Sequence, residues 1–255
     1  MSVFKNTYNH LRLLKEKMKF YYSVNWSKTL YFNFKKFPFA TAKILPVFFY
    51  GKVNFQNITG NIIINGPIKR GMFGFGCQFE MAQKSKGIAE FSLLGKLVLN
   101  GPMHIGKDVF FHVGKGAYCE FGYMNCLASD VKFICTNKIT LGDWTGVGYE
   151  TQIIDTHSHP MKNSLTNELY PITNPIIIGS HNTFSNRISI MCNTVTPDYC
   201  VIASNSICNK DYSELGNHIL IGGIPAKLIK NNYTRDWEGE KELLKRYRIS
   251  KWLPF

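Results

Sequence analysis

Residues 178–208 read IGSHNTFSNRISIMCNTVTPDYCVIASNSIC, and one kind of position returns at every sixth residue. These positions are mostly bulky and apolar: Ile178, Phe184, Ile190, Thr196, Ile202 and Cys208. A period of six fits neither the 3.6-residue turn of a helix nor the two-residue repeat of a strand. It fits a β-solenoid in which each flat face uses one hexapeptide. We therefore expect the bulky residue to point inward and small residues, such as Gly179 and Ala203, to lie at the corners.

The same period extends upstream of this stretch in shifted registers. It is seen at Ile105, Phe111, Ala117, Phe121, Leu127, Phe133, Leu141, Val147 and Ile153. Slips between the registers predict bulges or loosened corners. Two segments, 62–67 and 97–102, end alike in Asn-Gly-Pro and indicate that coils begin near Val53. Residues 66–95 fit the pattern poorly.

Composition narrows the possible partners. The 255-residue chain is 45% hydrophobic, which is ordinary for a core-forming protein, and no apolar run approaches the ~18–20 residues of a membrane span. Its net charge of +13 favours a polyanionic partner, an anionic membrane surface or a phosphorylated ligand over plain solubility. No zinc-finger or RNA-recognition signature is present, so we do not expect nucleic acid. Seven cysteines without a CxxC pair and no signal-peptide pattern predict a reduced, cytoplasmic protein.

The first 50 residues differ from the rest. Apolar residues fall at helical spacing among lysines and arginines, at Phe4, Tyr8, Leu11, Leu14, Met18 and Tyr21 or Tyr22. This pattern predicts a basic amphipathic helix that ends before Asn25 or Trp26. Residues 26–50 are aromatic and basic. The extension either attaches to the inner, anionic face of a membrane or covers the open end of the solenoid, where it could also serve as a trimer contact.

The remaining chain divides at two points. A polar loop at residues 160–177 interrupts the hexapeptides, and long loops in compact domains are often functional. The last coil is followed by IGGIPAKLI at residues 221–229, and a charged segment, 236–249, predicts a closing helix. We therefore expect an N-terminal extension at 1–50, a β-helix at 51–230 and a C-terminal helix within 231–255.

The array followed by IGGIPAKLI resembles the hexapeptide-repeat acyltransferases, whose fold is a left-handed parallel β-helix. The segments IIDTHSHP at 153–160 and NPIIIG at 174–179 resemble sugar O-acetyltransferases of surface-polysaccharide biosynthesis. The resemblance covers roughly residues 97–230, and residues 26–70 more weakly. It implies transfer of an acetyl group from acetyl-CoA to a hydroxyl of a sugar or lipid-linked oligosaccharide. It also implies a homotrimer with active sites in the grooves between subunits.

Acyl transfer to a hydroxyl needs a base, and histidine titrates near neutral pH without special tuning. The resemblance aligns His159 with the family's catalytic histidine. Asp155 would either orient an imidazole or accept hydrogen bonds from the backbone at a corner. His157 stands where the family usually has Asp, and it is a second substrate contact, an alternative base or a solvated residue. His181 and Asn182 would reach a facing subunit or lie on a surface corner.

For the cofactor, the resemblance implies that pantetheine lies along the late coils and that no metal is needed. Backbone groups near Ala203, Ser204 and Gly222 would contact it. Lys210 and Lys227 are candidates for its phosphates, unless they are simply solvated surface charges.

Other functions stay open on the same fold. A sugar-nucleotide N-acetyltransferase is a close variant, because an amine must also lose a proton. A metal-dependent lyase would use His157, His159 and His181 as zinc ligands, since His-x-His on a strand places both rings on one face. A non-catalytic scaffold would not bind acetyl-CoA.

Overall fold

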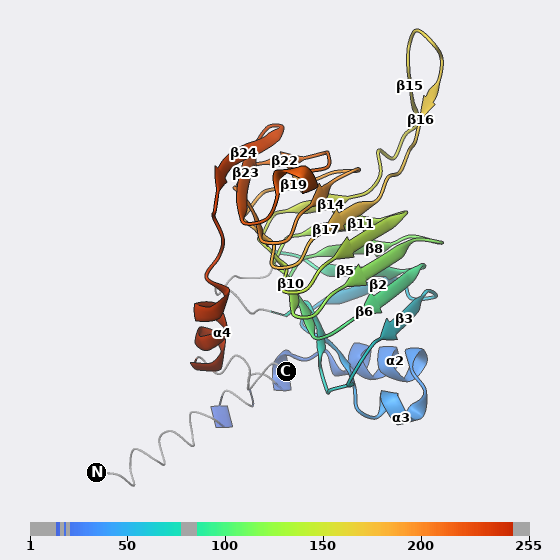
Figure 1. Ribbon diagram of the computed structural model, residues 1–255. Coiled ribbons are helices and arrows are strands. Elements are labelled where there is room, and N and C mark those ends of the chain that lie inside the picture. Colours follow the sequence, from blue (N-terminus) through green and yellow to red (C-terminus); the bar gives the residue numbers. More distant parts are fainter. Residues whose placement is uncertain (1–13, 16–17, 19–20, 78–85, 247–255) are drawn as a thin grey trace, which may run out of the picture.

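The computed structural model describes residues 14, 15, 18, 21–77 and 86–246, and it shows a parallel β-helix (Figure 1). Successive strands enter three long sheets in turn, so each full coil contributes one strand to each sheet. The ladders between coils are parallel. The mainly-β parallel β-helix expected from the hexapeptides is confirmed.

Among the described residues, the first sheet has the strand order β1 (Val47–Phe49), β4 (Phe73–Phe75), β7 (Met103–Ile105), β10 (Asn125–Leu127), β13 (Gly146–Val147), β18 (Thr183–Phe184), β21 (Cys200–Ile202), β23 (Ile219–Gly223) and β24 (Ala226–Asn231). The second sheet has the order β2 (Val53–Asn57), β5 (Ala89–Leu93), β8 (Phe110–Val113), β11 (Lys132–Cys135), β14 (Gln152–Ile154), β19 (Ser189–Ile190) and β22 (Ile207–Cys208). The third has the order β3 (Asn61–Ile64), β6 (Lys96–Leu99), β9 (Tyr118–Phe121), β12 (Lys138–Leu141), β17 (Ile176–Ile178) and β20 (Val195–Thr196).

Register explains the six-residue period. In the second sheet Phe111 pairs with Phe133, which pairs with Ile153, so inward side chains of successive coils stack directly. All positions that the period picked out between Ile105 and Cys208 are buried. Each hexapeptide therefore delivers one side chain to a continuous core, which runs the length of the solenoid.

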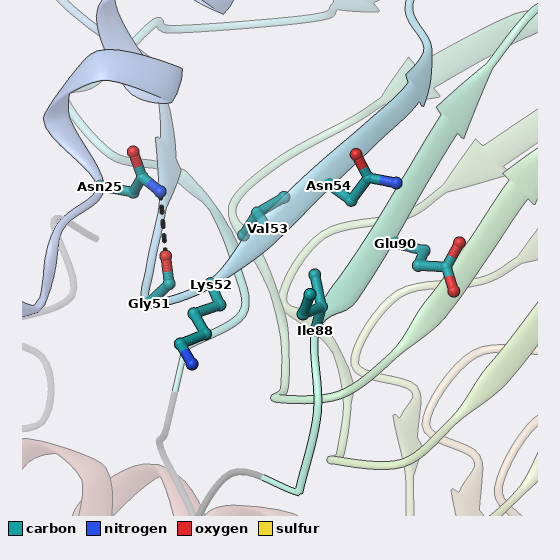
Figure 2. Close-up of a pocket in the computed structure, with 7 residues that line it drawn as sticks. All are labelled: Asn25, Gly51, Lys52, Val53, Asn54, Ile88 and Glu90. Carbon is teal, nitrogen blue, oxygen red and sulfur yellow. Dashed lines mark hydrogen bonds between the residues drawn. The ribbon is translucent and has the colours of Figure 1, made fainter.

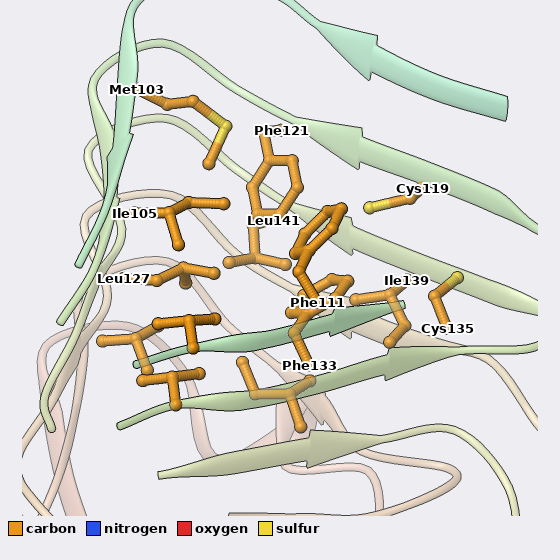
Figure 3. Close-up of a cluster of buried hydrophobic side chains, with 14 of the residues drawn as sticks. Met103, Ile105, Phe111, Cys119, Phe121, Leu127, Phe133, Cys135, Ile139 and Leu141 are labelled. Atoms are coloured by element: carbon orange, nitrogen blue, oxygen red, sulfur yellow. The ribbon is translucent and has the colours of Figure 1, made fainter. Parts of the chain in front are cut away.

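The core changes in character along its axis. Its early coils are filled by phenylalanines. The Phe91 and Phe111 rings stack at 5.5 Å. Phe111 also stacks on Phe133, at 5.0 Å, as Figure 3 shows. Its late coils are filled mostly by smaller groups such as Ile202 and Cys208, with Phe184 and Tyr212 as larger exceptions. Dispersion and apolar burial per coil therefore fall from the N-terminal to the C-terminal end.

The corners depend on residues in the left-handed backbone region. His181, Arg187, Asn193, Tyr199 and Asn205 have φ between 56° and 67° and again recur at a spacing of six. Their side chains point away from the core, so even bulky residues are accommodated there. Buried polar side chains satisfy the corner carbonyls: the Thr194 hydroxyl donates to the carbonyl of Cys208 at 2.8 Å.

Two small residues at the corners have no room for a larger side chain. A Cβ on Gly179 would lie 2.5 Å from the carbonyl oxygen of Pro197, and one on Gly148 would lie 2.1 Å from that of Ser185. These contacts are with backbone, which cannot move aside. The glycines therefore allow neighbouring coils to approach.

The open N-terminal end is closed by α2 (Trp26–Lys36), followed by the short α3 (Phe39–Ala42) (Figure 1). The Asn33 amide donates to the carbonyl of Val47 at 2.7 Å and accepts from its N–H at 3.2 Å. The Thr29 hydroxyl accepts from the N–H of Phe49 at 3.0 Å. Polar side chains of α2 thus pair the exposed edge of β1, which is where a solenoid is open to unwanted strand pairing.

The C-terminal end is closed differently. After β22 comes a 3₁₀ turn, η1 (Ser213–Leu215), and β23 and β24 then form an antiparallel hairpin. Helix α4 (Trp237–Arg246) contacts the side of the coils through Trp237, whose indole meets the His181 ring edge-on at 5.4 Å. The chain thus returns along the flank of the solenoid rather than ending at its top (Figure 1).

Several boundaries differ from those expected. The first coil begins at Val47 rather than at residue 51, and residues 66–95 contribute β4 and β5 despite their weak pattern. The helix expected before Asn25 lies largely outside the described residues, although Leu14, Lys15, Met18 and 21–23 are helical. Residues 247–255 are likewise outside them. No helix in the described chain is long and apolar enough to cross a bilayer.

Phe111 tests the stacked core. We expect Phe111→Ala to lower the free energy of unfolding by about 3–5 kcal/mol, because the ring is fully buried between two others. Phe110→Ala, which removes the neighbouring outward-facing ring, should cost clearly less. Urea unfolding of both variants measures the difference, and equal losses would contradict inward stacking as the main stabilising contact.

His104 predicts a pH dependence of stability. Burial lowers the pKa of His104 to about 3 in the folded protein. Below the ordinary histidine pKa of about 6.5, the unfolded chain binds a proton that the folded chain does not, so stability falls as pH falls from about 6.5 toward 3. When the pH is lowered from 7 to 5, the free energy of unfolding should fall by about 2 kcal/mol less in His104→Gln than in the wild type. An unchanged slope in urea titrations would contradict this.

Candidate functional site

An arm leaves the solenoid at the corner between the second and third sheets. Its stem begins where the Asn174 N–H donates to the carbonyl of Asp155 at 3.1 Å, and continues through an antiparallel bridge between Thr156 and Thr173. It ends in the two-stranded hairpin of β15 (Met161–Lys162) and β16 (Leu169–Tyr170), which projects beyond the coils (Figure 1). The segment expected as a loop at 160–177 is therefore an arm with regular hydrogen bonding over residues 155–174. Ile176 and Ile177 already belong to β17 (Ile176–Ile178).

His157 and His159 both lie on the stem of this arm. The His157 N–H donates to the carbonyl of Ile172 at 2.8 Å, and the His159 N–H donates to the carbonyl of His157 at 2.7 Å. Ser158 between them has φ 62°, and its N–H donates to the Thr156 hydroxyl at 2.9 Å. The backbone is thus fixed by hydrogen bonds while both imidazoles are exposed. Within the described chain, the His159 ring makes no hydrogen bond, so it is free to meet an acceptor.

Asp155 does not orient either imidazole. Its buried carboxylate accepts from the Thr136 N–H at 2.7 Å, from the Thr136 hydroxyl at 2.8 Å and from the Asn137 N–H at 2.8 Å. These donors belong to the corner of the preceding coil. Of the two roles considered for Asp155, the structure has the corner hydrogen bond, which ties the base of the arm to the solenoid.

His112 was not singled out from the sequence. It lies on the outer side of β8, in register with Ile134, which pairs in turn with Ile154 beside the arm. Partial burial lowers the pKa of His112, and the Asp155 carboxylate acts in the opposite direction. The alternation of side chains along a strand predicts that His112 faces outward. Its position below the stem follows only from the stacking of the coils.

The expected cofactor residues fall into two groups. Lys210 follows β22 at the same corner from which the arm leaves, two coils later. Ala203 and Gly222 lie at the corner between the first and second sheets, with Lys227 opposite Gly222 in the hairpin. The short strand β22 separates the two corners. The structure therefore brings Ala203, Gly222 and Lys227 together and places Lys210 at the far end of that strand.

The Ala203–Gly222 corner has little room. A Cβ on Gly222 would lie 2.8 Å from the Ala203 Cβ and 2.8 Å from Ile229 Cδ1. The Ser206 hydroxyl donates to the carbonyl of Ala203 at 2.6 Å and accepts from the Gly223 N–H at 3.0 Å. Ser204 is exposed, and its hydroxyl accepts from the Asn186 N–H at 3.3 Å. Small residues thus allow the two coils to pack closely at this corner.

Beside this corner, the hairpin of β23 and β24 presents apolar and cationic groups together. Ile224 is 72% exposed and Ile229 is 58% exposed. The side chains of Lys227 and Lys230 are exposed on the same hairpin. Such a surface suits a ligand that has both an apolar chain and phosphates.

His181 lies apart from the arm, at the corner where α4 contacts the coils. Its ring stacks on Tyr199 at 4.6 Å, and Tyr199 stacks on His218 at 4.4 Å. Burial and the nearby Lys241 ammonium lower the pKa of His181. Asn182 is buried and donates to the carbonyls of Ser180 and Pro197. In this chain both residues are part of a corner, and Asn182 is not available to a ligand.

No group of three or more His, Cys, Asp or Glu side chains in the described ranges is arranged to hold a metal ion. A wide pocket of about 450 Å³ lies near the N-terminal end, lined by Asn25, Gly51, Lys52, Val53, Asn54, Ile88 and Glu90 (Figure 2). It contains none of the residues expected from the sequence and no histidine. We therefore assign the candidate site to the arm and the late coils.

No protein-family model and no curated protein matches the chain. Among solved structures, it is similar to the polySia specific acetyltransferase NeuO, at a TM-score of 0.48 and 15% identity, covering 80% of this chain and 98% of that one.

Two further solved structures are similar. The polysialic acid O-acetyltransferase OatWY matches at a TM-score of 0.35 and 16% identity, covering 77% of this chain and 100% of that one. A hexapeptide-repeat acetyltransferase from Vibrio cholerae O1 biovar eltor, complexed with acetyl coenzyme A, matches at a TM-score of 0.37 and 21% identity, covering 58% and 71% of the two chains.

Asp155 tests how the arm is attached. We expect Asp155→Asn to lower the free energy of unfolding by about 2 kcal/mol, because an amide cannot accept all the bonds that the carboxylate accepts. Asp198→Asn is a matched control, since Asp198 is an exposed corner carboxylate that accepts one bond, from the Ser180 N–H, and should cost less. Full stability of Asp155→Asn, measured by urea unfolding, would contradict the corner role.

Proposed function

We propose that this protein is an acyltransferase that moves an acetyl group from acetyl-CoA to a hydroxyl of a sugar, with His159 as general base. The observation that carries the proposal is the position of His159. Its ring is exposed and has no hydrogen bond within the described chain, on a stem whose backbone is held by hydrogen bonds. A base must be free at the ring and fixed at the backbone, and His159 meets both conditions.

The late coils support the choice of co-substrate. Acetyl-CoA would supply the activated thioester. The exposed apolar side chains of Ile224 and Ile229, beside the Ala203–Gly222 corner, would lie against its narrow pantetheine chain. Lys227 would interact with its phosphates, and Lys210, at the other corner, is the second candidate.

The arm supports an acceptor site shared between subunits. Its large apolar side chains are exposed: Met161 (50%), Leu165 (90%), Leu169 (69%), Tyr170 (50%) and Ile172 (42%). A monomer rarely leaves such a cluster in water. We propose a homotrimer in which the arm of one copy covers the acceptor groove of the next, so that His159 faces the late coils of a neighbour.

The acceptor in this proposal is a sugar of a surface polysaccharide or its lipid-linked precursor. In acyl transfer, the His159 imidazole would take the proton of the attacking hydroxyl as its oxygen bonds to the acetyl carbon. The thioester C–S bond would then break, and the imidazolium would return the proton to the CoA thiolate, which leaves as the free thiol. His157 on the same stem would contact the acceptor. An amino sugar would need the same proton transfer, so N-acetylation is tested alongside. We place the reaction in the cytoplasm, where thiols such as the seven free cysteines stay reduced.

Removing the base is the direct test. We expect His159→Ala to lower the rate of acetyl transfer on the order of 10²–10⁴-fold, as loss of a general base does, with unfolding free energy unchanged because the ring is exposed. His157→Ala is the matched control on the same stem and should lose much less. Thiol release from acetyl-CoA measures the rate, with hydroxyl-bearing and amine-bearing sugars as acceptors.

Three outcomes would contradict the proposal in different ways. If His157→Ala is the inactive variant, the base is two residues away from the proposed one. If only amine acceptors react, the reaction is N-acetylation. If the wild-type protein does not bind acetyl-CoA in equilibrium dialysis, the acyltransferase assignment is wrong.

A further inference from the structure

The helix that closes the N-terminal end of the solenoid has two different faces. Its inner face carries Thr29, Phe32 and Asn33, all of them fully buried. Phe32 packs edge-on against Phe49 at 5.1 Å and Phe91 at 5.6 Å in the core. The hydrogen bonds of Thr29 and Asn33 to β1 described above fix the rotation of the helix. Its outer face is therefore set by the fold.

That outer face is apolar and aromatic. Leu30 is 44% exposed, Tyr31 52% and Phe34 49%, and on the adjoining α3 Phe39 is 73% exposed. Leu30 and Phe34 are one helical turn apart, so they lie on one side of α2. The Phe34 and Phe39 rings are 6.1 Å apart and join the two helices into one surface. We call these four residues the basal patch.

The surroundings of the basal patch are positively charged. Lys35 and Lys43 are exposed, and Lys28 is partly exposed. The Lys35 ammonium donates to the Tyr31 hydroxyl at 3.0 Å, which keeps it beside the aromatic ring. From Lys17 to Phe79 the sequence contains no Asp or Glu, so no carboxylate from this segment offsets these charges.

We propose that the basal patch docks on an anionic lipid bilayer, with α2 and α3 lying in the interface and the axis of the solenoid directed away from it. Exposed aromatic and aliphatic side chains flanked by lysines are the chemistry that binds the boundary between headgroups and acyl chains. Lysines near such a surface are attracted to anionic lipid headgroups. A nucleic acid or a free polyanion would use the lysines but not the exposed Phe34 and Phe39.

The geometry favours a flat partner. The basal patch lies at the base of the solenoid, whereas the hairpin of β15 and β16 projects at the opposite end (Figure 1). Both helices are too short to span a bilayer and would lie along it. This proposal does not depend on the chemistry of His159, so the two can fail separately.

Vesicle flotation tests the proposal on the full chain. We expect binding to phosphatidylcholine vesicles that contain phosphatidylglycerol and little binding to phosphatidylcholine alone. Lys35→Glu with Lys43→Glu should weaken binding at least about ten-fold, since each lysine near the surface contributes roughly five-fold. Phe34→Ser with Phe39→Ser should weaken binding similarly. The controls are Lys132→Glu and Ile88→Ser, which change an exposed lysine and an exposed isoleucine elsewhere and should bind as the wild type does.

A fluorescent variant keeps the test informative if the serine variants are unstable. Tryptophan at position 39, in Phe39→Trp, should be quenched by brominated acyl chains in anionic vesicles. Absence of wild-type binding to anionic vesicles overturns the proposal. So does vesicle binding that survives Phe34→Ser with Phe39→Ser, because the patch would then be only a polyanion surface. A fall in oligomer mass in that variant, without vesicle binding in the wild type, would assign the patch to a second copy of the chain.

Discussion

The stacking of inward side chains, coil upon coil, is the contact on which the rest of the molecule depends. Each hexapeptide alone buries too little apolar surface to be stable, and only its neighbours above and below complete the burial. The parallel ladders then follow from that alignment, because Phe111, Phe133 and Ile153 can stack only when their strands are in register. The same alignment forces the chain to turn sharply every few residues, which creates the corners.

The corners in turn determine where function can be placed. A turn that recurs so often needs its backbone groups satisfied, and buried polar side chains such as Thr194 and Ser206 do this. Asp155 does so with a carboxylate at the corner where the chain leaves the coil as the arm. A firm attachment at the base allows the stem to hold His159 in a defined position while the ring stays in solvent. The hydrogen bonds of Asp155 and the exposed imidazole of His159 are therefore two parts of the same structural arrangement.

The parts of the structure that were predictable share a physical cause. The period of six is visible because inward positions demand apolar side chains, and it identified Phe111, Val147 and Ile190 as core residues. The outward left-handed positions also recur every six residues, but their side chains vary because they lie outside the core, so this second period is hidden in the sequence. The weak pattern at residues 66–95 hid β4 and β5. The pairing of Asn33 with β1 could not be foreseen, since it joins residues whose relative positions only the fold decides. For the same reason Lys210 was grouped with Lys227, from which β22 separates it.

The change from stacked phenylalanines to smaller residues along the core has a consequence for local opening. In a structure whose units interact only with their neighbours, each coil is held by its own burial and by two interfaces. We therefore expect the coils built around Phe91 and Phe111 to open less often than those around Ile202 and Cys208, whose buried side chains are smaller. Amide hydrogens should exchange with solvent along a gradient that rises toward the late coils. On this expectation, the end of the molecule that would receive a ligand opens more readily than the base.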